Sequence, residues 1–138
     1  MSARDIFHQA VKNGLIKDGW TITHDPLSLS IGGVEMFVDL GAEKLIAAEK
    51  NGQKIAVEIK NFAGPSNISE FHTALGQFLD YEQALEEQEP DRVLYLAVPV
   101  DVYDTFFILQ FIQTAIRRHQ LRLLIYELEQ EVIARWQS

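Results

Sequence analysis

Residues 92–99, RVLYLAVP, form an almost unbroken apolar run. A run of this kind predicts a strand that is buried on both faces, as strands in parallel sheets are. Residues 68–87 before the run and 101–119 after it carry apolar side chains at helical spacing. A buried strand between two helices predicts an α/β fold in which helices flank a mixed sheet.

The rest of the chain supplies further candidate elements for that sheet. Residues 3–18 predict a helix, whose apolar stripe comprises Ile6, Phe7, Ala10, Val11, Gly14 and Leu15. Alternating or continuous apolar runs predict strands at 20–24, 27–31, 34–40, 44–50, 53–60, 121–128 and 131–136. The order is therefore a helix, a meander of strands, a helix, the buried strand, a helix and a final strand pair.

Turn and cap residues set the expected boundaries of these elements. Asn51-Gly52 separates KLIAAEK (44–50) from QKIAVEIK (53–60), and Asn-Gly between two such runs is a strong hairpin signal. Asn67 followed by Glu70 matches a capping box and predicts the start of the helix that ends near Glu87. Asp101 is the expected cap of the helix at 101–119.

Length and composition predict one soluble domain over residues 1–138. Such a chain, with 47% hydrophobic residues, buries one core. It has no cysteine, which rules out disulfides and thiolate metal sites and agrees with a reducing compartment. The first residues lack the apolar core of a signal peptide, and the most apolar run, 106–116, is too short to span a bilayer. We therefore expect a cytoplasmic protein that does not enter a membrane.

The charge balance argues against a broad nucleic-acid surface. Twelve Lys and Arg residues stand against 20 Asp and Glu residues, giving a net charge of −8. Binding to the phosphate backbone depends on Lys and Arg, so a local basic patch, bound cations or a basic partner would be needed. The densest basic cluster, RRHQLR (117–122), lies at an expected helix C-terminus, where cations are favoured without any ligand. The acidic run at 82–91 is a solvated helix end or a surface for a basic partner.

Two neighbouring strands carry charged residues that point to chemistry. On residues 53–60, Glu58 and Lys60 share one strand face, about 6.5 Å apart along the strand. The hairpin predicted above brings the segment that carries Asp39 alongside the end of this strand. Two converging carboxylates repel each other unless a cation lies between them, and hard oxygen ligands suit Mg²⁺. Lys60 would then orient a water or stabilise charge developing on a phosphate.

Each of these residues also has an ordinary interpretation. Asp39 before Gly41 is typical of a carboxylate that accepts a turn hydrogen bond, and Glu58 with Lys60 is typical of a solvated strand face. His8, one turn from Asp5 on the first helix, approaches the same strands but is typical of a surface histidine. No histidine spacing in the sequence supports a zinc site.

The pattern Asp39–x18–Glu58–x–Lys60 after an N-terminal helix resembles the PD-(D/E)XK nuclease superfamily, the restriction-endonuclease-like fold. The resemblance implies that Asp39, Glu58 and the carbonyl of Ile59 bind Mg²⁺ or Mn²⁺ and that Lys60 is the catalytic lysine. The motif QFLDY places Gln77 and Tyr81 on one helix face, similar to the Gln-x-x-x-Tyr element of several nuclease lineages. The pair is also typical of a half-exposed Gln beside a packing Tyr. Residues 36–38, Met-Phe-Val, depart from the proline that many members have before the aspartate.

A closer resemblance spans nearly the whole chain. The stretches ARDIFHQAVKNGLIKDGWTITHDPL, VDLGAEKLIAAEKNGQKIAVEIKNFAGPS, ALGQFLDY, EPDRVLYLAVP and QEVIARW resemble the XisH family of fdxN-element excision controlling factors of cyanobacteria. The family implies an accessory role in developmentally programmed DNA excision, beside a recombinase and a companion protein, XisI. Two hypotheses follow: a metal-dependent endonuclease acting on DNA, or an inactive regulatory module that binds the recombinase or XisI. The acidic charge and small size also favour a homo-oligomer or a partner complex.

Overall fold

The computed structural model describes residues 3–44 and 52–138. Its elements, in chain order, are α1 (Ala3–Lys17), β1 (Thr21–His24), β2 (Leu27–Ile31), β3 (Val34–Val38), β4 (Leu40–Lys44), β5 (Gln53–Ile59), α2 (Asn67–Gln88), β6 (Arg92–Pro99), α3 (Val100–Val102), a π-helical turn (Tyr103–Phe107), α4 (Gln110–His119), β7 (Leu123–Glu127) and β8 (Val132–Gln137). None of the helices in these residues is long and apolar enough to cross a membrane.

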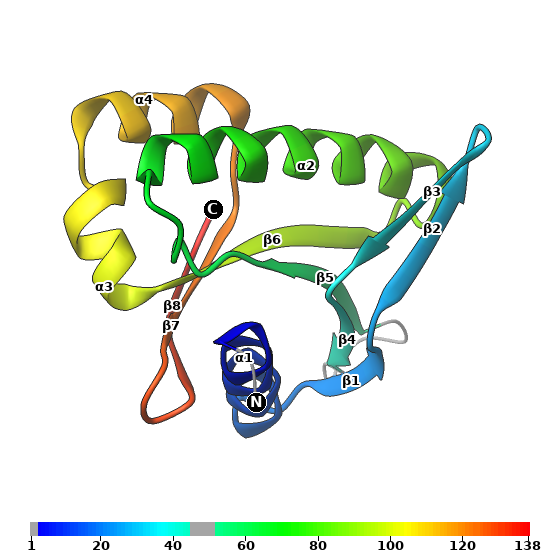
Figure 1. Ribbon diagram of the computed structural model, residues 1–138. Helices are drawn as coiled ribbons and strands as arrows, with labels where there is room; N and C mark the ends of the chain where they lie inside the picture. Colours follow the sequence, from blue (N-terminus) through cyan, green and yellow to red (C-terminus); the bar gives the residue numbers. More distant parts are fainter. Residues whose placement is uncertain (1–2, 45–51) are drawn as a thin grey trace.

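Six strands form one mixed sheet in the order β1-β4-β5-β6-β7-β8. The pairs β1/β4, β4/β5 and β7/β8 are antiparallel, whereas β5, β6 and β7 run parallel to one another. Strands β2 and β3 form a separate antiparallel hairpin, which projects beside the end of α2 (Figure 1). The predicted mixed sheet flanked by helices is therefore confirmed.

Helices cover the two faces of the sheet unequally. Figure 1 shows α2 and α4 on one face and α1 on the other. The side chains of β5 alternate accordingly, since Ala56 belongs to the buried cluster under α2 whereas Ile55 and Val57 belong to the cluster under α1. Leu96 and Ala97 on β6 divide in the same way, so the second half of RVLYLAVP is buried on both faces as expected. In the first half, Val93 is 40% exposed.

The stripe predicted for the first helix is buried along most of its length. Ala10, Val11 and Leu15 are at most 1% exposed, although Ile6 is 47% exposed. A Cβ atom on Gly14 would lie 3.4 Å from backbone atoms of residues 131–133. The missing side chain therefore lets α1 lie directly against the start of β8.

The strand predicted at 34–40 is interrupted at Asp39. Residues before it belong to β3 in the hairpin, and residues after it belong to β4 in the main sheet. Strand β4 pairs with β5 from Leu40↔Val57 to Lys44↔Gln53, so the antiparallel partner of β5 lies at 40–44. Of the strand predicted at 44–50, the part at 45–50 lies outside the described residues, as does Asn51 of the predicted turn. Because 34–40 reads as one alternating run, local sequence does not reveal the change of sheet.

The cap predicted for α2 is displaced by one residue. Ser66, not Asn67, is the N-cap, and its hydroxyl accepts a hydrogen bond from the Ser69 N–H at 3.3 Å. The Glu70 carboxylate accepts from the Gly64 N–H at 3.0 Å instead of completing a capping box. Glu70 therefore holds the loop that follows β5.

The helix predicted at 101–119 is broken, and Asp101 does not cap it. The N-cap of α3 is Pro99, without a side-chain hydrogen bond, and α4 begins only after the extended Leu109. Between them, Phe106 and Phe107 are adjacent in sequence yet both buried, and both rings pack against Phe62. A regular α-helix turns adjacent side chains about 100° apart, so tertiary packing of these two rings overrides the helical pattern.

Candidate active site

A cleft of about 430 Å³ opens where the hairpin, the end of β5, α2 and the start of α1 meet. All five residues whose side chains were predicted to form a site line it. Among the described residues, the lining comprises Phe7, His8, Phe37, Asp39, Glu58, Ile59, Lys60, Asn61, Glu70, Gln77 and Tyr81.

Backbone hydrogen bonds fix Asp39 against the end of β5. The Ile59 N–H donates to Asp39 Oδ2 at 2.8 Å, and the Asp39 N–H donates to Glu58 Oε1 at 3.2 Å. These bonds replace ladder pairing at the residue where the chain leaves the hairpin for the main sheet. The sequence expectation that the segment carrying Asp39 lies beside the end of the strand carrying Glu58 is therefore confirmed.

Glu58 and Lys60 face the same side, as the strand period predicts. Glu58 is 7% exposed, and its Oε2 atom lies 3.8 Å from Lys60 Nζ. The Lys60 N–H donates to the Ala97 carbonyl at 3.0 Å, which extends the pairing of β5 with β6 by one residue. The lysine is thereby held at the sheet end, with its ammonium group beside the buried carboxylate.

The electrostatics of the cleft favour a proton or a cation at Glu58. Burial, reinforced by the charge of Asp39, raises the pKa of Glu58 from 4.5 to about 8, although Lys60 opposes this shift. The two carboxyl groups also lie within hydrogen-bonding range of each other. The ion pair with Lys60 is long at 3.8 Å, so it does not cancel the cost of burying two neighbouring carboxylates.

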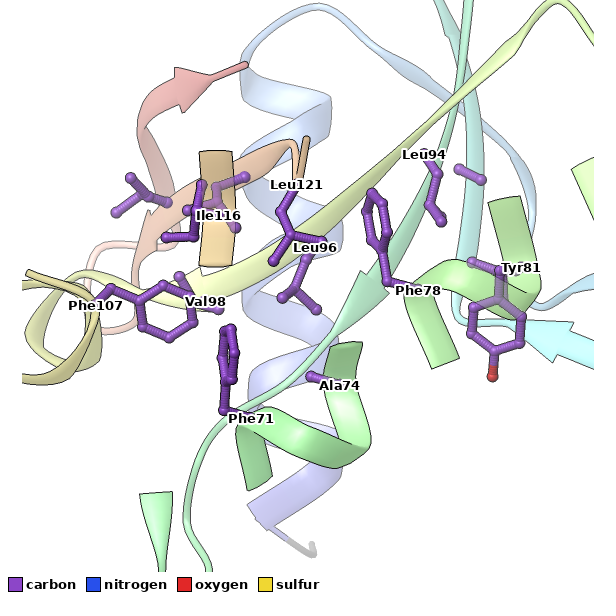
Figure 2. Packing of buried hydrophobic residues seen from close by; sticks show 14 of the residues in the cluster. Phe71, Ala74, Phe78, Tyr81, Leu94, Leu96, Val98, Phe107, Ile116 and Leu121 are labelled. Carbon is purple, nitrogen blue, oxygen red and sulfur yellow. The ribbon is translucent and has the colours of Figure 1, made fainter. Parts of the chain in front are cut away.

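Helix α2 contributes Gln77 and Tyr81 from one face, as their spacing predicts. Gln77 Oε1 is buried and has no hydrogen-bond partner among the described residues. Tyr81 is 8% exposed, and Figure 2 shows its ring at the margin of the core, with the hydroxyl directed away from the other labelled side chains. Burial, followed by the charges of Glu58, Asp39 and Asp80, raises the pKa of Tyr81 to about 12. Its phenol therefore stays protonated and can donate a hydrogen bond.

The oxygen atoms in the cleft suit a small divalent cation. Because the N–H and C=O of one strand residue point to the same side, the Ile59 carbonyl faces the side on which its N–H meets Asp39. Two carboxylates and one carbonyl leave positions for water, which Mg²⁺ retains in most sites. In the described part of the chain, no group of three or more His, Asp or Glu residues is arranged to hold a metal, so a site here rests on the Asp39–Glu58 pair.

Five lining residues were not predicted as site residues. Nothing in the sequence pattern points to Phe7, Phe37 or Asn61 as site residues, apart from their closeness in sequence to His8, Asp39 and Lys60. Glu70 was interpreted as part of a capping box. His8, interpreted as a surface residue, lines the cleft, while its Nε2 atom lies 2.8 Å from Asp25 Oδ1.

Asp25 also accepts from Lys12 at 2.9 Å, so two residues of α1 hold this carboxylate. Those contacts, reinforced by the positive charges of His8 and Lys12, outweigh burial and lower the pKa of Asp25. No local pattern links Asp25 to α1, because the contact depends on how α1 packs beside β1.

Comparisons with known proteins show the family of the chain. Residues 1–134 match a family model described as XisH protein. The chain belongs to the XisH family. A comparison with curated protein sequences gave no significant match.

Two solved XisH-type structures share the fold over almost the full chain. The crystal structure of an XisH family protein from Nostoc punctiforme PCC 73102 is 52% identical, covers 97% of this chain and 100% of that one, and superposes with a TM-score of 0.90. The structure of a fdxN element excision controlling factor protein from Anabaena variabilis is 54% identical, covers 96% and 98%, and has a TM-score of 0.87.

Proposed function

We propose that this XisH-family protein acts in the controlled excision of a DNA element and carries a metal-dependent, endonuclease-like site. The excision role is supported by the Anabaena variabilis relative, described as a fdxN element excision controlling factor. The endonuclease role is supported by one observation: Asp39, Glu58 and Lys60 meet at one sheet end, in a cleft that also holds Gln77 and Tyr81. This arrangement matches the PD-(D/E)XK pattern of the sequence.

In this proposal, each residue of the cleft has a distinct task. Asp39, Glu58 and the Ile59 carbonyl hold Mg²⁺ or Mn²⁺, an ion that polarises a phosphodiester oxygen when bound. Lys60, beside Glu58, stabilises negative charge that develops on the phosphate. Gln77 Oε1, buried and without a partner among the described residues, accepts a hydrogen bond from a bound water or substrate group. Tyr81 donates from its neutral phenol.

The test is cleavage of plasmid and single-stranded DNA with Mg²⁺ or Mn²⁺, alone and with a purified XisI-type partner. We expect nicking by the native chain and a loss of about 100-fold or more in Glu58→Gln and Lys60→Ala. The first change removes a charged ligand of the cation, and the second removes the positive charge beside the reacting phosphate. Lys54→Ala is the matched control. Lys54 lies on the same face of β5 but forms its ion pair outside the cleft, with Asp91 at 3.7 Å.

A metal-binding measurement separates binding from chemistry. Calorimetric titration with Mg²⁺ or Mn²⁺ should show uptake by the native chain and by Lys60→Ala, but much weaker uptake by Glu58→Gln. Absence of cation-dependent cleavage under all conditions, with the partner included, contradicts the endonuclease proposal. Cleavage that survives in Glu58→Gln contradicts the assignment of the site.

A second candidate function is a regulatory module that engages a recombinase, an XisI-type protein or a second copy of the chain. The observation that favours it is an apolar surface before and at the start of α4, where Ile108, Leu109 and Phe111 are 56%, 50% and 72% exposed. Exposed apolar groups that lie together often mark protein contacts. The experiment measures excision of the DNA element in cells that carry each variant. If Glu58→Gln still supports excision whereas Phe111→Ser does not, the regulatory function is favoured over the endonuclease.

A further inference from the structure

Phe37 has an apolar side chain that does not belong to the buried core. It lies on β3, is 52% exposed and lines the cleft two residues before Asp39. Its neighbours on the strand, Met36 and Val38, point to the other face and pack against the core under α2. Its cross-strand partner is Ser28, which is exposed. The ring is thus an exposed aromatic surface at the candidate site.

An exposed phenylalanine is common on protein surfaces and means little by itself. Here, however, the hairpin that carries it is anchored. The Gln88 side chain accepts from the Ser30 N–H at 2.9 Å and donates to the Ser28 carbonyl at 3.0 Å, which ties β2 to the end of α2. The hairpin that carries the ring is therefore held at the cleft that contains Asp39 and Glu58.

The charges around the cleft limit how much nucleic acid it can hold. Among the residues that the structure describes, three acidic side chains line it (Asp39, Glu58 and Glu70), and Lys60 is the one lining Lys or Arg. Lys12 on α1 binds the same Asp25 carboxylate as the lining residue His8, so its charge is already engaged. A protein that grips duplex DNA neutralises several phosphates with Lys and Arg, which this lining does not offer. The described lining therefore offers positive charge for about one phosphate, at Lys60.

The geometry points to single-stranded DNA as the substrate class, with one base stacked on Phe37 and the adjoining phosphate at Asp39, Glu58 and Lys60. The inference rests on the proposed endonuclease-like function. The cleft volume of about 430 Å³ is typical of a small-molecule site and is suited to one nucleotide. Stacking on an aromatic ring provides affinity without the positive charge that the cleft lacks, and it tolerates any base.

Binding of a short single-stranded oligonucleotide that contains a stacking-quenched fluorescent adenine analogue tests this inference. Ca²⁺ replaces Mg²⁺ so that binding is measured without turnover. We expect the native chain to quench the analogue and to bind the single strand more tightly than the matching duplex. Phe37→Ala should weaken single-strand binding about tenfold and abolish quenching, whereas Phe37→Trp should retain both. Val34→Ala is the control, because Val34 is 55% exposed on the same strand and lies outside the cleft.

The outcomes separate this inference from the proposed function. Three outcomes overturn single-strand recognition, even if the chain still cleaves DNA with Mg²⁺. They are equal binding of duplex and single strand, no binding of either, and unchanged quenching in Phe37→Ala. Quenching that depends on Phe37 in a protein that never cleaves upholds recognition while removing the endonuclease proposal. Circular dichroism of each variant confirms that the fold is retained.

Discussion

The Asp39 carboxylate accepts a 2.8 Å hydrogen bond from the backbone N–H of Ile59. This bond joins the residue between two sheets to the strand that carries Glu58 and Lys60. Glu58 Oε1 in turn accepts a hydrogen bond from the Asp39 N–H. The two acidic residues are therefore positioned by backbone groups, which holds them together despite the repulsion between their charges.

The burial of Glu58, reinforced by the charge of Asp39, predicts a pH-dependent stability. The pKa of Glu58 is raised from 4.5 to about 8, so the folded state retains a proton that the unfolded state loses between these values. The free energy of unfolding of the native chain therefore falls as pH rises through this window. Glu58→Gln cannot ionise, so we expect it to match the native chain at about pH 5 and to exceed it by on the order of 1–3 kcal/mol at about pH 9. Urea denaturation at the two pH values measures this.

Glu86→Gln, a change at an exposed position of α2, is the control for that experiment. It should leave the pH dependence of the native chain in place. If the free energy of unfolding differs between Glu58→Gln and the native chain by the same amount at both pH values, the difference does not arise from ionisation of Glu58.

We expect the Gln77 side chain to lower the free energy of unfolding, because it serves the cleft and not the stability of the fold. Its buried Oε1 lacks a hydrogen-bond partner among the described residues, and an unpaired buried acceptor costs about 1–3 kcal/mol. Gln77→Leu should therefore raise the free energy of unfolding by about 1 kcal/mol while reducing any DNA cleavage. Gln83→Leu, at an exposed position of the same helix, should change neither quantity. A destabilised Gln77→Leu would show that the side chain is structural.

Phe107 and Phe111 provide a matched pair of aromatic truncations. Phe107 is 0% exposed and packs against Phe62 and Phe71, whereas Phe111 is 72% exposed. Phe107→Ala should cost about 3–5 kcal/mol because it leaves a cavity, and Phe111→Ala should change stability by less than about 0.5 kcal/mol. Thermal unfolding of the two variants checks this. Equal losses would contradict the packing described for the broken helix.

Arg92 is a buried cation that secures the start of β6. It is 5% exposed, and its Nη1 group donates to the Ile55 carbonyl at 2.9 Å while Nη2 donates to Glu89 at 2.9 Å. Arg92→Ala leaves a buried carbonyl and a carboxylate without this donor, so we expect a loss of about 2–4 kcal/mol. Arg118→Ala, at an exposed position of α4, should be neutral in the same chemical denaturation experiment.

The sequence by itself determined most elements of the sheet and part of the lining of the cleft. Alternation along residues 53–60 placed Glu58 and Lys60 on one face, and the spacing of Gln77 and Tyr81 placed both on one face of α2. These properties depend on the strand and helix periods, which are local. The continuous run at 92–99 likewise required a strand buried on both faces.

Only the tertiary structure decided the remaining features. Asp39 separates two strands because the chain changes sheets there, and the adjacent Phe106 and Phe107 are both buried because of rings on other segments. Phe37 and His8 reach the cleft through the placement of the hairpin and of α1, and the pKa of Glu58 depends on a neighbour 19 positions away. Such features arise from contacts between segments distant in sequence, which no local period encodes.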